Sequence, residues 1–383
     1  MNGKLSAIKI MEQEAGKIKG SVSLAQGIPS FPSHPLIRER VIKAIESGAV
    51  DKYSPVAGLL ELRELISKEL DNRYSPETEI IVTGGAVEAI SATIIALFNK
   101  GDELIVPTPT YPYYSRICDM TGVRFVPVEL GDGWSLSPEQ IEAVITPKSR
   151  GILICNPNNP TGTILSEKEL IAISNLARKK DLIIISDDVY EDFFYDEEII
   201  FNLRHKQELK DILIRVVSLS KSFALSGWRI GFLHGPESLI DKILRIHDNL
   251  INCAPVVSQY AALEAIKNRD KIMPDYLLQY RSRRYLMENH LRRMGDMVDF
   301  VRPAGTYYFF PKIRKMDDSV VFCLDMLREV GLATVPGREF GPGGEGHVRL
   351  CFGRSEEEIE DGMVRMKKYL LKRQRKGGTL SYN

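Results

Sequence analysis

A lysine between two serines offers the clearest chemistry in this sequence. The segment Ser218–Gly231, SLSKSFALSGWRIG, carries Lys221 just after an apolar run and Arg229 eight residues further on. Serine hydroxyls and backbone N–H groups can hold some oxygens of a phosphate ester, and a planar guanidinium can hold two others. Because apolar residues flank Lys221, we expect its amine to be partly buried, with a lowered pKa that permits attack on a carbonyl. The segment therefore predicts an amine beside a bound phosphate group.

This segment resembles the cofactor-lysine signature of the class I aminotransferases, of the aspartate/aromatic type and its gamma branch. These are pyridoxal 5′-phosphate (PLP) enzymes of fold type I. Further family landmarks follow in the family's order over nearly the whole chain. The resemblance implies that Lys221 holds PLP as a Schiff base. It also implies phosphate contacts from Ser218, Ser220 and Arg229. Without these landmarks, a lone lysine in such a loop would more commonly be a solvated surface residue.

Two loops after apolar runs resemble the family's contacts to the cofactor ring. The segment CNPNNPTG, residues 155–162, resembles the NPxNPTG turn and implies that Asn159 donates a hydrogen bond to the phenolate oxygen. The segment IIISDDVYEDF resembles the strand ending in SDEVY, which implies Asp187 at the pyridine nitrogen and Tyr190 at the phenolate oxygen. A carboxylate there keeps the ring protonated and hence a good acceptor of electrons. We predict a structural role for Asp188. Alone, these residues could form a tight loop and a helix N-cap.

Three more segments resemble contacts around the phosphate and the ring. In IVTGGAVEAI, the resemblance implies that the backbone N–H groups of Gly85, Ala86 and Val87 face the phosphate from a helix N-terminus. In PTPTYPYY it implies that Tyr111 stacks on the cofactor ring, although an aromatic residue is as often part of a core. In KYSPVAGLLELR it implies that Tyr53 reaches the phosphate of the neighbouring subunit, in a homodimer.

Two segments far apart in the chain resemble the family's substrate site. LAQGIPSF implies that Gly27 lies near the substrate carboxylate, with Ile28 where the family often has glutamate. GEGHVRLCFG implies that Arg349 binds that carboxylate, beside Asn159, because its fork matches two oxygens. A buried structural ion pair is the alternative for this arginine. Acid-specific relatives can have lysine at the position of Val87, so we expect substrates with neutral or aromatic side chains. Glutamate can still be the amino donor.

Together these roles imply an aminotransferase that moves the amino group of an L-amino acid to a 2-oxo acid through pyridoxamine phosphate. Lys221 is then the catalytic acid and base, with Asp187 and Tyr190 acting on the ring. The same residues also begin other PLP reactions, so a carbon–sulfur lyase, a cyclase or an oxidase is the alternative. A transcription regulator built on this fold would need a further DNA-binding domain of roughly 70 residues. We expect no such domain, because the chain begins directly with the arm.

Short apolar runs alternate with amphipathic stretches between residues 79 and 234. The amphipathic stretches include Ala86–Asn99 and Ser166–Lys179, and Ser166 with Glu169 predicts a capping box. Continuous apolar runs are typical of parallel strands buried on both faces, so the alternation predicts a doubly wound α/β domain with a mostly parallel, seven-stranded sheet. The predicted strands are Glu79–Val82, Glu103–Val106, Arg124–Val128, Gly151–Cys155, Leu182–Ser186, Arg215–Leu219 and Ile230–His234.

The pattern changes after residue 255, where long helical stretches such as Tyr276–Met294 dominate. Two strand candidates, Thr306–Phe310 and Val348–Phe352, precede a last helix at Ser355–Leu371. These elements predict a smaller α+β domain. The expected division is an N-terminal arm with part of the small domain at 1–45, a large PLP-binding domain at 46–280 and a small domain at 281–383.

Composition supports a small-molecule enzyme. The 383 residues are enough for two cores, and 51 basic residues balance 51 acidic ones, which disfavours nucleic acid or membrane partners. Five cysteines without a CxxC pair predict buried thiols rather than disulfides or a metal site. The lack of a signal-peptide pattern or a long apolar run favours a cytoplasmic protein. The closing run KKYLLKRQRKGG could bind a partner, but a solvated helix end is favoured.

Overall fold

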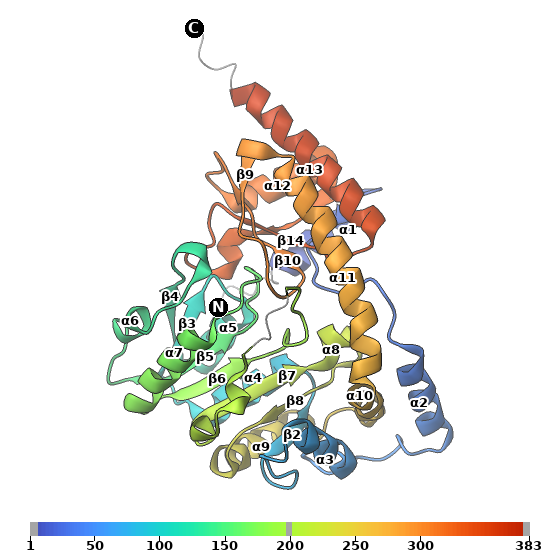
Figure 1. Ribbon diagram of the computed structural model, residues 1–383, viewed down its shortest axis with the longest axis vertical. Helices are drawn as coiled ribbons and strands as arrows, with labels where there is room; N and C mark the ends of the chain where they lie inside the picture. The colour runs from blue at the N-terminus through green and yellow to red at the C-terminus, as the bar shows by residue number, and fades with distance from the viewer. Residues whose placement is uncertain (1–6, 197–200, 378–383) are drawn as a thin grey trace.

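The computed structural model describes residues 7–196 and 201–377 (Figure 1). Its larger part is built around a seven-stranded sheet. The strand order is β2-β8-β7-β6-β5-β3-β4, and all neighbours are parallel except the two pairs that contain β8. The predicted mostly parallel sheet and its seven strands are confirmed. The strands are β2 (Ile80–Thr83), β3 (Glu103–Thr108), β4 (Arg124–Glu129), β5 (Ser149–Cys155), β6 (Ile183–Asp187), β7 (Leu213–Ser218) and β8 (Gly231–His234).

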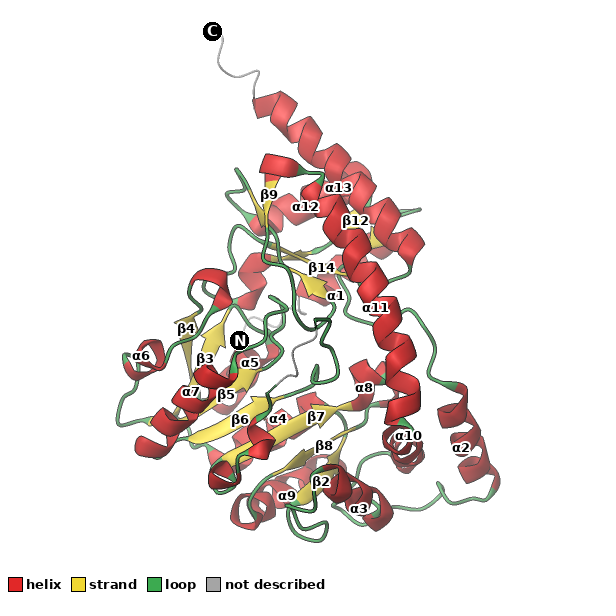
Figure 2. Ribbon diagram, in the orientation of Figure 1, coloured by secondary structure: helices red, strands yellow, loops and turns green. Residues whose placement is uncertain are grey.

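Two cores cover the two faces of this sheet, and helices lie on both sides of it (Figure 2). Neighbouring strand residues belong to different cores: Ile184 of β6 lies in one and Ile185 in the other. Since successive side chains point to opposite faces, this alternation makes the sheet doubly wound. The helices around the sheet are α3 (Leu60–Glu69), α4 (Ala86–Leu97), α5 (Tyr113–Thr121), α6 (Pro138–Glu142), α7 (Glu167–Lys179), α9 (Glu237–Ile251) and α10 (Val256–Lys267).

The antiparallel strand β8 follows from the short connection after β7. This connection holds only the one-turn helix α8 (Leu219–Ser222) and a 3-10 turn, whereas a parallel return needs a crossover that spans the sheet. The chain therefore turns back at the carboxyl edge of the sheet. As a result, Lys221 and Arg229 stay at that edge. The predicted capping box is also present, since Ser166 and Glu169 bond to each other's backbone N–H groups.

The C-terminal part is smaller and is built around a three-stranded antiparallel sheet, β10-β14-β13. The predicted helix at 276–294 starts earlier and contains Pro274, and the predicted last helix continues for six more residues. The assigned domain boundaries stay a prediction. The elements of this part are α11 (Arg269–Arg292), β9 (Val298–Asp299), β10 (Tyr308–Phe309), β11 (Lys312–Ile313), α12 (Ser319–Val330), β12 (Leu332–Ala333), β13 (Val335–Pro336), β14 (Val348–Cys351) and α13 (Glu356–Gly377).

The N-terminal arm contacts both parts of the molecule. Helix α1 (Ala7–Gly16) and strand β1 (Val22–Ser23) pack on the C-terminal part, where β1 pairs in parallel with β12. Helix α2 (Pro35–Glu46) instead packs against α10 of the large part. Within the described ranges, no helix is both long enough and apolar enough to cross a bilayer. All five cysteines are buried and free, as predicted.

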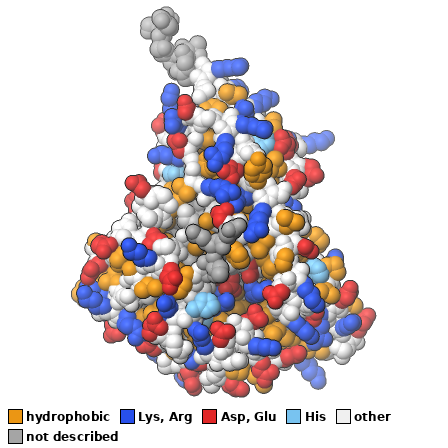
Figure 3. All heavy atoms as spheres, in the orientation of Figure 1, with side chains coloured by type: hydrophobic (Ala, Val, Ile, Leu, Met, Phe, Trp, Pro, Cys, Tyr) orange, Lys and Arg blue, Asp and Glu red, His pale blue; other side chains and the backbone are white. Residues whose placement is uncertain are grey.

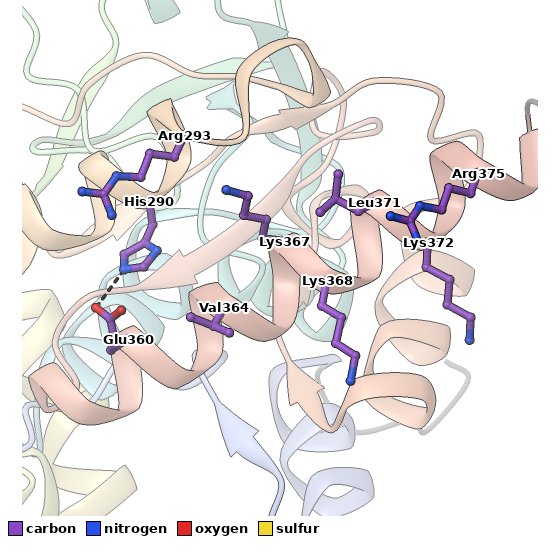
Figure 4. A pocket seen from close by; sticks show the side chains of 9 residues that line it. All are labelled: His290, Arg293, Glu360, Val364, Lys367, Lys368, Leu371, Lys372 and Arg375. Atoms are coloured by element: carbon purple, nitrogen blue, oxygen red, sulfur yellow. Dashed lines mark hydrogen bonds and ion pairs between the residues drawn. The ribbon is translucent and has the colours of Figure 1, made fainter.

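The surface carries charges of both signs over the face shown in Figure 3. One groove of about 850 Å³ between α11 and α13 is mainly basic, and there His290 lies 2.8 Å from a carboxylate oxygen of Glu360 (Figure 4). None of the predicted site residues lines this groove. Residues 371–375 of α13 are exposed, which agrees with a solvated helix end, and residues 378–383 lie outside the described part. The groove is lined by His290, Arg293, Glu360, Val364, Lys367, Lys368, Leu371, Lys372 and Arg375.

Candidate active site

The predicted site residues meet in a cavity of about 560 Å³ at the carboxyl edge of the sheet. Most of them lie at the ends of β2, β3, β5, β6 and β7, and because the carboxyl ends of parallel strands share one edge, residues distant in sequence come together. Gly27 and Ile28 come from the N-terminal arm, and Arg349 comes from β14. All of them except Gly85 and Tyr53 line the cavity. These lining residues are Gly27, Ile28, Ala86, Val87, Tyr111, Asn159, Asp187, Tyr190, Ser218, Ser220, Lys221, Arg229 and Arg349.

Gly85 and Tyr53 are absent from the cavity lining for different reasons. Gly85 is the N-cap of α4, with φ 91°, and a Cβ there would lie 2.7 Å from Nη2 of Arg229. The position therefore requires glycine, because of both its backbone and the close arginine. Tyr53 is 82% exposed and lies outside this cavity, so one chain alone does not bring it to the site. Its contact with a neighbouring subunit stays a prediction.

The amine of Lys221 points into the cavity toward the N-terminal arm. Its Nζ donates a hydrogen bond to the carbonyl oxygen of Gly27 at 2.8 Å. Burial lowers the pKa of Lys221 to about 8, and the positive charges of Arg349 and Arg229 act in the same direction. The amine is therefore much easier to deprotonate than a solvated lysine, as a carbonyl-attacking group requires.

The carboxylate of Asp187 is buried beside the lysine. The Tyr114 hydroxyl donates to its Oδ2 at 2.5 Å, and the backbone N–H of Val189 donates to its Oδ1 at 3.3 Å. Burial raises the pKa of Asp187 to about 7, although the hydrogen bond from Tyr114 opposes this. Among the described side chains, none forms a salt bridge with Asp187. A buried carboxylate of this kind suits a ligand that brings its own positive charge, such as a protonated ring nitrogen.

Tyr114 is a site residue that the sequence reasoning missed. It is fully buried on α5, and its ring packs edge-on against Tyr111 with centroids 5.8 Å apart. The signal was present in PTPTYPYY, since Tyr114 follows Tyr111 by three residues, and its backbone N–H bonds to the carbonyl oxygen of Tyr111 at the start of α5. Tyr308 was also missed. Its hydroxyl lies 3.1 Å from that of Tyr190, and its ring lies beneath the guanidinium of Arg349.

We expect Tyr114→Phe to weaken binding of PLP, the cofactor that the resemblance implies, by about tenfold, since hydrogen bonds to charged groups contribute about 1.5–3 kcal/mol and part of this holds Asp187 in place. The measurement is the cofactor dissociation constant from equilibrium dialysis. Tyr113→Phe is the matched control, because its hydroxyl lies 2.5 Å from that of Ser91 instead of Asp187. Equal affinities of the two variants for PLP would contradict the prediction.

One corner of the cavity fits a phosphate group. The Ser220 hydroxyl is buried there without a hydrogen-bond partner. Arg229 adopts φ 53°, a left-handed conformation that is uncommon for residues other than glycine, and its guanidinium donates to carbonyl oxygens of Ser226 and Gly84. The N-terminus of α4 begins at Gly85 without a side-chain cap. Free N–H groups, a hydroxyl and a guanidinium are the donors that a phosphate accepts.

Arg349 has the environment of an anion-binding residue. Its side chain is buried, and it donates to Oδ1 of Asn159 at 3.0 Å and to the carbonyl oxygen of Ala25 at 2.6 Å. Its Nε is buried without a partner. Within the described residues no carboxylate pairs with it, so the alternative of a structural ion pair does not apply there. A buried guanidinium with an unpaired N–H fits a substrate carboxylate.

Comparison with known proteins agrees with this geometry. Residues 19–366 match the family described as aminotransferase class I and II. Aromatic-amino-acid aminotransferase 2 of Thermococcus litoralis is 33% identical, with 95% of each chain covered. The aspartate aminotransferase of Pyrococcus abyssi is also 33% identical over 95% of each chain. The crystal structure of the Pyrococcus horikoshii aromatic aminotransferase superposes with a TM-score of 0.88 at 33% identity, covering 95% of this chain and 99% of that one.

The family match spans both parts of the molecule and includes every segment that lines the cavity except Ile8 and Lys9 of α1. The donors in the phosphate corner, the amine of Lys221 and the unpaired carboxylate of Asp187 together fit PLP. The enzyme therefore exchanges amino groups between amino acids and 2-oxo acids. The chain belongs to the class I and II aminotransferase family and is a PLP-dependent aminotransferase of fold type I.

Proposed function

We propose that Lys221 is the catalytic acid and base of this aminotransferase and moves the proton at the substrate Cα. The observation that carries this role is its amine, with a pKa of about 8, in the same cavity as Asp187 and Arg349. PLP supplies an aldehyde for amine exchange and a ring that accepts electrons. Asp187 holds the proton on the ring nitrogen, and Arg349 binds the substrate carboxylate beside Gly27 and Asn159.

Other cavity residues, together with Gly85 at the N-cap of α4, hold the cofactor in this proposal. Tyr190 and Asn159 would contact its phenolate oxygen, and Tyr111 would hold the ring by stacking. The phosphate is held by backbone N–H groups and by donors at two turns of the chain. These phosphate contacts are Gly85, Ala86, Val87, Ser218, Ser220 and Arg229.

A screen of amino donors tests the reaction. The PLP-loaded enzyme is mixed with single amino acids, and both the visible absorption of the cofactor and the products are followed. One equivalent of 2-oxo acid per subunit, without ammonia, supports amino transfer. Pyruvate together with ammonia would instead indicate a lyase and overturn the proposal.

The substrate side chain in this proposal is neutral or aromatic. Ile8, Ile28 and Val87 give the cavity an aliphatic wall. Of the cations that line it, Lys221, Arg229 and Arg349 have other roles. Lys9 is the further cation of this lining, and it is exposed, so its attraction for a second carboxylate is weak in water. The donor screen should therefore favour phenylalanine, tyrosine or leucine over aspartate.

Arg349→Lys should raise KM about 10- to 100-fold for every amino acid, because a lysine cannot give two parallel hydrogen bonds to a carboxylate and such charged bonds contribute about 1.5–3 kcal/mol. Steady-state kinetics with one aromatic and one aliphatic donor measure this change. Arg354→Lys is a control in the same part of the molecule, where the arginine pairs with Glu358. A loss confined to one class of side chain would contradict the assignment.

We also propose a homodimer in which Tyr53 reaches the neighbouring site. Its 82% exposure in the single chain supports a contact outside that chain. Tyr53→Ala should lower PLP affinity about tenfold, as expected for one lost phosphate hydrogen bond. At a PLP concentration too low to load Tyr53→Ala, mixing this variant with Lys221→Ala should restore activity, because the mixed dimer contains one intact site. No recovery after subunit exchange would contradict the arrangement.

The free cysteines further support a cytoplasmic location, where thiols stay reduced.

A further inference from the structure

A buried arginine lies beneath the turn that carries Asp187 and Tyr190. Arg215 is part of β7, and its side chain is completely buried. Its Nε donates to Oδ2 of Asp188 at 2.5 Å, and its Nη2 donates to a carboxylate oxygen of Glu191. One guanidinium therefore connects two carboxylates of the same turn.

These two carboxylates belong to the residues that directly follow the two proposed cofactor contacts. Asp188 follows Asp187, and Glu191 follows Tyr190. Asp187 and Tyr190 line the active-site cavity, whereas Glu191 lines a separate cavity of about 230 Å³. Arg215 therefore holds the turn from the side that faces away from the active-site cavity.

Other hydrogen bonds fix Asp188 in the same place. Its carboxylate accepts from the Ser186 hydroxyl at 2.6 Å and from Nδ2 of Asn202 at 2.9 Å, and its backbone N–H donates to the carbonyl oxygen of Val216 at 2.9 Å. Both the carboxylate and the backbone of Asp188 are therefore held by hydrogen bonds.

Stability alone is a poor explanation for this arginine. Replacing a buried ion pair with apolar residues is often neutral or stabilising, and the other β7 residues up to Val217 are apolar. Burial alone would raise the pKa of Glu191, but the charges of Arg215, Arg269 and Arg204 together outweigh it and the pKa is lowered. The pair is thus held charged within the interior. What it provides is a fixed geometry for the turn.

We propose that Arg215 is a positioning residue, which binds the carboxylates of Asp188 and Glu191 and thereby sets the directions of Asp187 and Tyr190. The inference rests on the proposed roles of these two cavity residues. A shift of about 1 Å in a catalytic group can cost about 10²-fold in rate, so a clamp on the turn has a direct catalytic consequence. Lysine in place of Arg215 keeps the charge but cannot reach both carboxylates in the same fork.

The test compares Arg215→Lys with Arg284→Lys as PLP-loaded enzymes. Arg284 is also nearly buried and pairs with Asp196, but it does not line the cavity. Both variants should lose thermal stability to a similar degree. Only Arg215→Lys should lower kcat, by about 10- to 100-fold with KM within about threefold, as expected for displaced catalytic groups. Only this variant should also shift the visible absorption and circular dichroism bands of the bound cofactor.

The proposal is overturned if Arg215→Lys loses stability while kcat and both spectra stay at wild-type values. Should that variant not fold, Asp188→Asn and Glu191→Gln each remove one carboxylate and keep the arginine. Each is then expected to change the cofactor spectra, and wild-type spectra in both would also overturn the proposal. A failure of the underlying roles is recognised separately, because Asp187→Asn would then leave kcat and the cofactor spectra at wild-type values.

Discussion

Lys221→Ala should lower the rate of amino transfer by about 10²–10⁴-fold or more, the usual contribution of a positioned acid–base group. The variant loses both the amine that bonds to the cofactor and the group that moves the proton at Cα. Because the pKa of Lys221 is lowered to about 8, the wild-type amine is mainly protonated below this pH and mainly free above it. Capture of PLP by the wild-type protein should therefore become faster as the pH rises through about 8.

Borohydride reduction followed by mass spectrometry tests this role without measuring turnover. The wild-type protein should gain the mass of one reduced cofactor per chain, and Lys221→Ala should gain none. Lys180→Ala is the control, since this lysine pairs with Glu142 at the surface and should leave both labelling and activity unchanged. Label on Lys221→Ala, or transfer at a comparable rate without an added amine, would refute the assignment.

Local pattern was enough to predict the strands, and resemblance to family motifs predicted most cavity residues. Each strand of the large sheet is a short apolar run, and the chemistry follows at its end, so position in sequence already gives the edge of the sheet. Lys221 was indicated by its place after an apolar run, whereas Tyr111 and Asn159 were predicted because their segments resemble the family's motifs. The positions that needed a long-range contact could not be found. Tyr308 meets Arg349 because β10 pairs with β14, where Tyr308 lies opposite Cys351, and it meets Tyr190 because the C-terminal part packs against the turn after β6.

The supporting residues were missed for a related reason. Arg215 was part of a predicted apolar strand, and nothing in its sequence neighbours indicated that it faces Asp188 and Glu191 across the β6–β7 pair. Register between parallel strands decides such contacts, and register depends on the packing of the entire sheet. Likewise, the exposed Tyr53 has no partner within the described residues of one chain that could reveal its role. Sequence therefore indicated the groups that react better than the groups that hold them.

Asp187→Asn should lower kcat by about 10²–10³-fold, comparable to the loss of one preorganised electrostatic contact in other active sites. The amide has no charge to hold a proton on the ring nitrogen. The pKa of Asp187 is raised to about 7 in the cofactor-free protein, so wild-type affinity for PLP should fall as the pH drops below about 7. The variant should bind weakly at every pH and lack this dependence. Asp211→Asn, which removes a surface partner of Arg178, should behave like the wild type.

Asp187→Asn should lower kcat but should raise the stability of the cofactor-free protein. Since the carboxyl pKa of Asp187 is raised by folding, the cofactor-free protein loses stability as the pH rises from about 4 to about 7, where the buried group must ionise. Asp187→Asn removes this cost, so its cofactor-free form should melt at a higher temperature than the wild type at pH 8. At pH 4 the difference should nearly vanish. A lower melting temperature of Asp187→Asn than of the wild type at pH 8 would mean that the carboxylate stabilises the fold. It would contradict the view that the buried carboxylate destabilises the cofactor-free protein and serves to bind a charged ring.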